Sequence, residues 1–148
     1  CNEIRIIGEI SSPNNDIIDA WNSMLLDFPQ ERFDFLKTIN KRYNSFLLSN
    51  TNSIHLEALN KIILEKNNVS NLNSYFLATY YSHLVGLRKP HPEIFQHVID
   101  DNNLNPESTL FIDDSVQHVN GAKSIGIQSV LLDTNTETVI NKLSFLLT

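Results

Sequence analysis

The stretch TLFIDDSVQHVNGAKSIGI, residues Thr109 to Ile127, contains the pattern that decides the fold. It opens with the short apolar run Thr109–Ile112, which has the length and composition of a buried strand and runs into Asp113 and Asp114. The spacing of apolar residues then predicts a helix over Val116–Ile125, closed by a glycine and followed by another apolar run. The stretch therefore predicts a strand, a helix and a second strand that runs parallel to the first.

The same alternation of apolar runs and amphipathic segments extends upstream to Glu31. The predicted strands are Ser45–Asn50, Tyr75–Ser82, Thr109–Ile112 and Ile127–Leu132, and the predicted helices are Glu31–Tyr43, Ile54–Lys66, Pro90–Asp101, Val116–Ile125 and Thr136–Leu147, with two further helices, Asn2–Ile10 and Asp16–Phe28, before them. This order predicts the α/β class, with an open parallel sheet and helices on both faces. Ligands of such sheets bind at the carboxyl ends of the strands.

The composition is that of a globular domain and excludes several classes of function. The 148 residues include 11 Lys and Arg against 17 Asp and Glu, a net charge of −6, which argues against a nucleic-acid partner. The single cysteine, Cys1, cannot form an internal disulfide, so we expect a reducing, cytoplasmic location. No apolar run approaches the roughly 20 residues that span a bilayer, and we expect no membrane association.

Asp113 and Asp114 are the first candidate site residues. Neighbouring carboxylates at the end of an apolar strand repel each other, and a hard cation with oxygen ligands, usually Mg²⁺, would offset that repulsion. The alternative is that Asp114 caps the helix at Val116 while Asp113 is solvated. Taken alone, the pair leaves both interpretations open.

Other polar residues follow the remaining strands. The Ser49 hydroxyl and the backbone N–H of Asn50 could hold a phosphate oxygen, although an ordinary helix cap would use the same residue types. Lys89 lies in the loop after the second strand and could neutralise a phosphate or order a carboxylate, although a lone loop lysine is more often solvated. Asn135 lies beyond the fourth strand.

Several other chemistries lack support in the sequence. The chain contains no HExxH, cysteine cluster, GxGxxG, Walker loop or Gly-x-Ser-x-Gly, the patterns of zinc, dinucleotide, nucleotide and serine-hydrolase sites. Response-regulator receivers combine an acidic pair, a hydroxyl and a lysine around Mg²⁺, but their acidic pair comes first in the chain. Here Ser49 and Lys89 precede Asp113 and Asp114, which is incompatible with that topology.

Three stretches in this order resemble motifs II, III and IV of the haloacid dehalogenase superfamily. They are FLLSNTN (Phe46–Asn52), GLRKPHPEIF (Gly86–Phe95) and the Thr109–Ile127 stretch, and the resemblance covers essentially the whole chain. It implies a Rossmann-like core, and the nearest branch resembles the small sugar-phosphate phosphatases with a helical cap. True haloacid dehalogenases need no metal and lack the Asp113-Asp114 pair, so a Mg²⁺-dependent phosphatase is preferred over a dehalogenase.

The resemblance implies a role for each of these residues. Ser49, helped by the Asn50 amide, would hold the transferring phosphoryl group of a small phosphorylated substrate such as a sugar phosphate. Lys89 would neutralise charge on the nucleophile and the phosphate. Asp114 would be the Mg²⁺ ligand, with Asp113 as a further carboxylate. These roles suit phosphoryl transfer, in which positioning and charge neutralisation supply most of the catalysis.

His118 and the missing motif I depart from the family pattern. His118 stands where relatives often have Asn or Asp, and it could hydrogen-bond to Asp113 or Asp114 or point outward. No Asp-x-Asp, which would carry the nucleophile, precedes Ser49. We therefore expect residues 1–28 to be the remnant of a helical cap and residues 29–148 to be a core without its central motif I strand.

Such a chain would be an inactive fragment of a longer enzyme, with the missing N-terminal segment as its partner. Removal of the central strand would leave two strand edges with unpaired backbone groups. Two alternatives stay open at this point. One is a complete but catalytically dead binding protein, and the other is a phosphotransferase similar to β-phosphoglucomutase.

Overall fold

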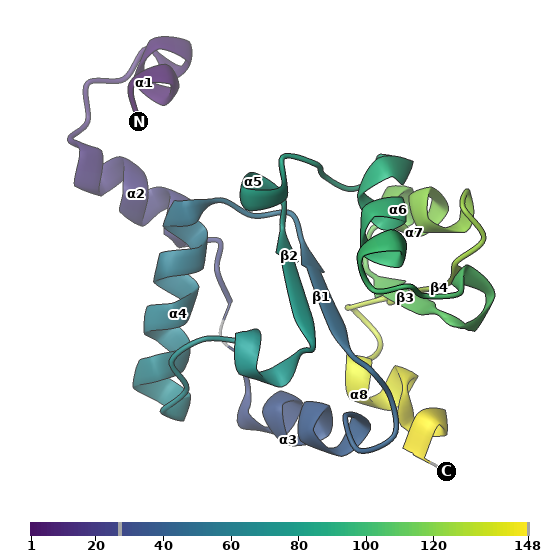
Figure 1. Ribbon diagram of the computed structural model, residues 1–148. Coiled ribbons are helices and arrows are strands. Elements are labelled where there is room, and N and C mark those ends of the chain that lie inside the picture. Colours follow the sequence, from purple (N-terminus) through teal and green to yellow (C-terminus); the bar gives the residue numbers. More distant parts are fainter. Residues whose placement is uncertain (27, 148) are drawn as a thin grey trace.

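The computed structural model describes residues 1–26 and 28–147 (Figure 1). Its helices and strands, in chain order, are α1 (Asn2–Gly8), α2 (Asn14–Asn22), α3 (Gln30–Ile39), β1 (Phe46–Ser49), α4 (Ser53–Asn67), β2 (Ala78–Tyr81), α5 (Ser82–Val85), α6 (Pro92–Asp101), β3 (Leu110–Asp113), α7 (Val116–Lys123), β4 (Gln128–Leu131) and α8 (Val139–Lys142). Short 3₁₀ turns lie at Asn73–Tyr75, Pro106–Ser108 and Ser144–Leu147. The predicted α/β class and the alternation of helices and strands are confirmed.

The strands form two parallel pairs. β1 pairs with β2, with Leu48 opposite Tyr80, and β3 pairs with β4, with Ile112 opposite Val130. Within residues 1–26 and 28–147, no ladder of hydrogen bonds joins one pair to the other. The parallel direction is as predicted, and the interruption agrees with the expectation of a sheet without its central strand.

Helices cover both faces of the strands, because the strand side chains alternate between two sides. Leu48 of β1 and Phe111 of β3 pack against a buried apolar cluster built mainly by α6 and α7. Leu47 of β1 faces a cluster of α3 and α4, while Leu110 and Ile112 of β3 face a cluster of α3 and the α8 region. The strand pairs thus share apolar cover on each face although they are not hydrogen-bonded to each other.

The N-terminal helices pack loosely. Helix α1 buries no side chain, and its Ile6 and Ile7 are largely exposed. Helix α2 buries Ile17 and contacts α4, where His55 Nε2 lies 3.1 Å from the carbonyl oxygen of Trp21. The predicted helix Asp16–Phe28 is wrong in extent, because α2 ends at Asn22, and Asp27 lies outside the described residues.

The segment before Lys89 differs from the prediction. Residues Asn73–Tyr75 form a 3₁₀ turn, so the strand expected over Tyr75–Ser82 begins only at Ala78. Helix α5 follows at once and ends at Val85. The next residue, Gly86, has a φ of 76°, a left-handed conformation that favours glycine. The loop with Lys89 therefore follows a short helix instead of following β2 directly.

The predicted helix Thr136–Leu147 is also shorter. The Thr138 side chain accepts a hydrogen bond from the backbone N–H of Asn141 and caps a single turn, α8. Leu143 then leaves the helical conformation with φ −101° and ψ 7°, and its side chain is buried in the cluster of α3. In the part of the chain that the structure describes, no helix has the length and apolarity needed to cross a membrane.

Candidate active site

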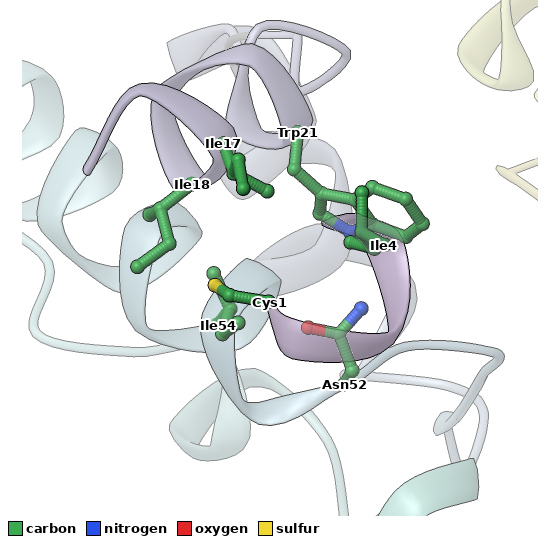
Figure 2. A pocket seen from close by; sticks show the side chains of 7 residues that line it. All are labelled: Cys1, Ile4, Ile17, Ile18, Trp21, Asn52 and Ile54. Atoms are coloured by element: carbon green, nitrogen blue, oxygen red, sulfur yellow. The ribbon is translucent and has the colours of Figure 1, made fainter. Parts of the chain in front are cut away.

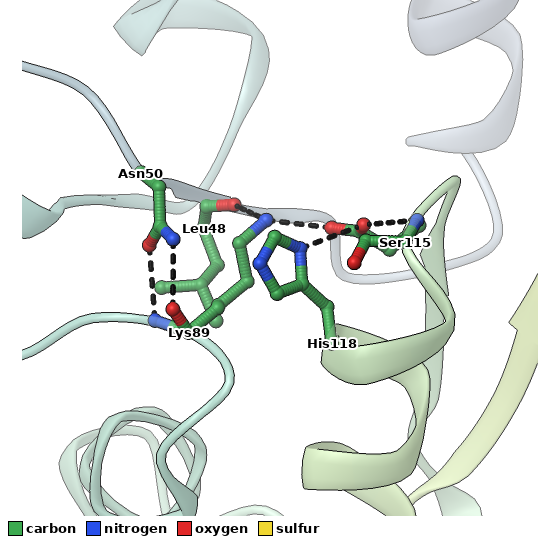
Figure 3. Close-up of polar contacts among 6 residues, drawn as sticks. Leu48, Asn50, Lys89, Ser115 and His118 are labelled. Atoms are coloured by element: carbon green, nitrogen blue, oxygen red, sulfur yellow. Dashed lines mark hydrogen bonds and ion pairs between the residues drawn. The ribbon is translucent and has the colours of Figure 1, made fainter.

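Lys89 joins the two strand pairs through its side chain (Figure 3). Its ammonium Nζ donates to the carbonyl oxygen of Leu48 in β1 at 3.0 Å and to Oδ2 of Asp113 in β3 at 2.6 Å. Only 7% of Lys89 is exposed, so the alternative of a solvated loop lysine is wrong. A buried ammonium is costly without a counter-charge, and the Asp113 carboxylate provides one.

Asp113 is held from its other side as well. Its Oδ1 accepts the backbone N–H of Ser115 and lies 2.9 Å from Nδ1 of His118 on α7. Burial raises the pKa of this carboxyl, but Lys89, the Ser115 N–H and His118 together lower the pKa below its usual value. The Asp113 side chain is 9% exposed, so it is a buried carboxylate and the solvated alternative is wrong.

His118 takes one of the arrangements left open by its sequence. An ionised carboxylate has only acceptors, so Nδ1 of His118 donates its hydrogen to Oδ1 of Asp113. The side chain is 21% exposed and therefore sits at the rim of the buried Lys89–Asp113 pair. It supports Asp113 from the first turn of α7.

Asn50 engages Lys89 through the backbone of that residue. Its Nδ2 donates to the carbonyl oxygen of Lys89, and its Oδ1 accepts the Lys89 N–H, both at 2.9 Å (Figure 3). The sequence suggested the backbone amide of Asn50 as a phosphate donor and missed this contact of its side chain. The two residues are 39 positions apart, and no local pattern could have paired them.

Ser49 and Asp114 lie beside this cluster without direct contacts to it. Ser49 ends β1, and within the part of the chain that the structure describes no hydrogen-bond partner is found for its hydroxyl. Asp114 is exposed at the start of the loop that leads to α7. The N-cap residue of α7 is Ser115, so the alternative in which Asp114 caps that helix is wrong. Asn135 contacts Asp133 through its backbone N–H and does not join the cluster.

Gly121 is a further residue that the site requires and that the prediction did not single out. A Cβ at this position of α7 would lie 2.1 Å from the carbonyl oxygen of Pro90, which is far inside van der Waals contact. Helix α7 can therefore press against the loop next to Lys89 only because residue 121 has no side chain. The Gly-Ala pair after the helix start was the available signal in the sequence.

A separate apolar pocket lies between the N-terminal helices and the start of α4 (Figure 2). It has a volume of about 180 Å³ and is lined by Cys1, Ile4, Ile17, Ile18, Trp21, Asn52 and Ile54. Asn52 is three positions beyond Ser49, but its Oδ1 is occupied by the backbone N–H of His55 as the cap of α4. The pocket thus offers mainly apolar surface.

Metal ligands are few in the chain itself. Among the described residues, no three His, Cys, Asp or Glu side chains are grouped so that they could hold a metal ion. Asp113 and Asp114 are neighbouring oxygen donors at the end of β3, and oxygen donors suit Mg²⁺. The oxygens of Asp113 already accept three hydrogen bonds, so Asp114 is the less engaged of the two carboxylates and the better placed to bind a cation.

Comparisons with known proteins identify relatives in sequence and in fold. A D-ribitol-5-phosphate phosphatase of Bacteroides thetaiotaomicron is 30% identical over 110 residues, 74% of this chain and 53% of that protein. The chain therefore spans about half the length of this relative. A HAD family enzyme of the same organism, solved as a variant in complex with magnesium and inorganic phosphate, superposes with a TM-score of 0.85 at 32% identity, covering 95% of this chain and 69% of its own.

A HAD-like family hydrolase of Porphyromonas gingivalis superposes with a TM-score of 0.86 at 32% identity, covering 99% of this chain and 70% of its own. The family model described as haloacid dehalogenase-like hydrolase matches residues 51–132, more than half of the sequence. That segment contains Lys89, Asp113, Asp114 and His118, the residues that the fold gathers at the strand ends. The chain belongs to the haloacid dehalogenase-like hydrolase family.

Proposed function

We propose that the protein carrying this chain is a Mg²⁺-dependent phosphatase that hydrolyses a small phosphorylated metabolite such as a sugar phosphate. The observation that carries the proposal is the buried Lys89–Asp113 pair at the carboxyl ends of β1 and β3, with Ser49 and Asp114 beside it. The relative named D-ribitol-5-phosphate phosphatase supports the substrate class.

Phosphate binding falls to the β1 side of the site. The Ser49 hydroxyl and the backbone N–H of Asn50 would each donate to a phosphate oxygen at the end of the strand. The Lys89 ammonium has three N–H donors, and the Leu48 carbonyl and Asp113 take two of them. The ammonium also lies 5.6 Å from the centre of the Phe111 ring. No third hydrogen-bond partner is found within residues 1–26 and 28–147, so the third donor would serve the phosphate.

Mg²⁺ would be held on the β3 side, with Asp114 as its direct ligand. Asp113 would support the site without being the direct ligand, because its two oxygens accept hydrogen bonds from Lys89, Ser115 and His118. Mg²⁺ commonly keeps several waters and takes only one or two carboxylates together with substrate phosphate oxygens, which fits so small a set of protein ligands. When bound, the cation would neutralise charge on the phosphate.

The nucleophile would come from a segment that precedes Cys1. We propose that this segment adds a parallel strand between β1 and β3 and ends in an Asp-x-Asp motif beside Lys89. The interruption between the strand pairs and the reach of Lys89 from Leu48 to Asp113 support this place for it. Without that segment the 148 residues would be inactive.

The reaction would proceed in two steps. A carboxylate oxygen of the first aspartate attacks phosphorus, the bond from phosphorus to the leaving-group oxygen breaks, and the second aspartate gives its proton to that oxygen. Water then gives a proton to the second aspartate and attacks phosphorus, and the bond from phosphorus to the first aspartate breaks, which releases inorganic phosphate and restores both aspartates. Lys89 and Ser49 hold the phosphoryl oxygens in place through both steps, and positioning of this kind supplies most of the catalysis in phosphoryl transfer.

The test is phosphate release by the full-length protein over a panel of sugar and sugar-alcohol phosphates, with Mg²⁺ and with a chelator. We expect Mg²⁺-dependent release, and a loss of about 10²–10³-fold in kcat for Asp114→Asn, the scale seen when one group that stabilises transition-state charge is removed. Asp34→Asn is the matched control, since Asp34 is an exposed carboxylate paired with Lys37 on α3. Full activity of Asp114→Asn, or in the chelator, would contradict the proposal.

A further inference from the structure

We propose that Asn50 is a positioning residue, whose side chain fixes the Lys89 backbone and thereby aims the Lys89 ammonium at the junction of β1 and β3. The inference rests on the proposed function only for its kinetic consequence, because the contacts themselves are independent of the reaction. It gives the Asn50 side chain a role that acts through Lys89 and not on the substrate.

The first support is the form of the contact between Asn50 and Lys89. The carboxamide donates to the Lys89 carbonyl oxygen and accepts the Lys89 N–H, with both distances at 2.9 Å. Two hydrogen bonds from one planar group to one residue fix the orientation of the loop backbone as well as its distance. The following Lys89–Pro90 peptide bond is cis, and Pro90 has no N–H with which to hold the loop further.

The second support is that Lys89 returns to the same strand. Its ammonium donates to the carbonyl oxygen of Leu48, which is two positions before Asn50. The contacts therefore form a closed ring: the Asn50 side chain holds the Lys89 backbone, and the Lys89 side chain holds the β1 backbone at Leu48. The Lys89 backbone is bonded to Asn50 and its ammonium to Leu48, so the ammonium is held where it also reaches Asp113 in β3.

The Asn50 side chain uses its oxygen and one of its two N–H donors on the Lys89 backbone, so a direct contact of its second N–H with a ligand is the alternative that the experiment separates. Both hydrogen bonds to Lys89 are part-buried. Loss of the carboxamide would leave the Lys89 N–H and carbonyl without these partners, and the loop would be expected to shift to regain them. A shift of the backbone would carry the ammonium away from Asp113.

The experiment compares Asn50→Ala, Asn50→Asp and the control Asn40→Ala in the full-length protein. Asn40 also holds a backbone carbonyl through its side chain, that of Tyr75, but lies outside the site. The first readout is hydrogen exchange of the Lys89 backbone amide. We expect exchange to become at least about tenfold faster in Asn50→Ala and to stay unchanged in Asn40→Ala. Asn50→Asp keeps the acceptor for this amide and should keep much of the protection.

The second readout is steady-state kinetics with the best phosphorylated substrate. Misplacement of Lys89 should lower kcat by about 10–100-fold while KM changes little, since an error of position near the reacting group mainly affects the transition state. Asn50→Asp should also lose kcat, because it cannot donate to the Lys89 carbonyl. This variant keeps the test valid if Asn50→Ala fails to fold.

Two results would overturn the proposal. One is unchanged exchange of the Lys89 amide in Asn50→Ala, which would mean that the side chain does not hold the loop. The other is an effect confined to KM or to inhibition by inorganic phosphate, which would make Asn50 a direct phosphate ligand. Faster exchange in a protein that releases no phosphate from any substrate would instead refute the proposed function and leave the contact to Lys89 standing.

Discussion

The β1–β2 and β3–β4 pairs are alike in geometry and differ in chemistry. Each consists of two parallel strands of four residues. Ser49 ends β1 and Asn50 follows it, and they carry a hydroxyl and an amide. Asp113 ends β3 and Asp114 follows it, and both carry carboxylates. Hydrogen-bond donors for an anion thus lie on one pair and oxygen ligands for a cation on the other. Under the proposed function, neither pair alone would make a site for a phosphate and its metal ion.

Lys89 is the group that makes the two pairs depend on each other. Its loop is fastened to β1 by Asn50, but its charge is neutralised by Asp113 at the end of β3. The apolar clusters that the pairs share would keep them together without it, since Leu48 and Phe111 pack into the same core. The Lys89–Asp113 ion pair fixes the position of the hydrogen-bond donors of the β1–β2 pair relative to the carboxylates of the β3–β4 pair.

The largest effect should follow from removal of this link. Lys89→Met keeps the length of the side chain but leaves Asp113 buried without its counter-charge, and the loss of one partner of a buried pair costs about 3–5 kcal/mol in the free energy of unfolding. Denaturant unfolding would measure it. Lys37→Met breaks the exposed pair of Lys37 with Asp34 and should change stability by less than about 1 kcal/mol.

A second substitution tests whether the charge of Asp113 causes this loss. Adding Asp113→Asn to Lys89→Met removes the buried charge and should restore part of the stability, because an amide keeps an acceptor for the Ser115 N–H. A double variant whose loss equals the sum of the two single losses would show that Lys89 and Asp113 are not coupled.

The next effect concerns the close contact between α7 and the Lys89 loop. Gly121→Ala puts a methyl group 2.1 Å from the Pro90 carbonyl oxygen, so helix and loop must separate, at an expected cost of about 1–3 kcal/mol for overpacking. Thermal unfolding measures the loss. Gly8→Ala in α1 is the control, because its new methyl group would meet only ordinary contacts with the Ile10 side chain. A neutral Gly121→Ala would mean that the loop is not pressed against α7.

A smaller loss of stability is expected from a change in the cap of α4, the helix that follows β1. Asn52 caps α4 by accepting the backbone N–H of His55, and loss of such a cap costs about 1 kcal/mol. Asn52→Ala should therefore lower the stability by this amount without changing the hydrogen exchange of the Lys89 amide. Faster exchange at Lys89 in this variant would show that the cap and the lysine loop form one unit.

The smallest effect is the pH dependence that belongs to Asp113. Its pKa is lowered in the folded state, so its contribution is complete above the unfolded pKa of about 3.9 and is lost as the pH falls through the folded pKa. The difference in unfolding free energy between wild type and Asp113→Asn should therefore stay constant from pH 6 down to about 3.9 and shrink as the pH falls further, through the folded pKa. A difference that stays constant, or grows, as the pH falls below about 3.9 would contradict the assigned direction of the shift.

The sequence was informative where a pattern is local. The apolar run before Asp113 and the glycine after the next helix are enough to place β3 and α7, and the apolar runs placed Ser49 and Asp113 at strand ends. Helix α5 escaped prediction because four residues are too few to show a helical period. The burial of Lys89 escaped it too, since lysine is buried only when a distant residue, here Asp113, supplies the counter-charge.

The most direct measurement is a crystal structure of the full-length protein with Mg²⁺ and inorganic phosphate. The account predicts one further parallel strand, hydrogen-bonded to both β1 and β3, that ends in an aspartate beside Lys89. It also predicts Mg²⁺ bound to Asp114 and a phosphate oxygen within hydrogen-bonding distance of the Lys89 ammonium. Direct pairing of β1 with β3, or a phosphate bound away from Lys89, would contradict it.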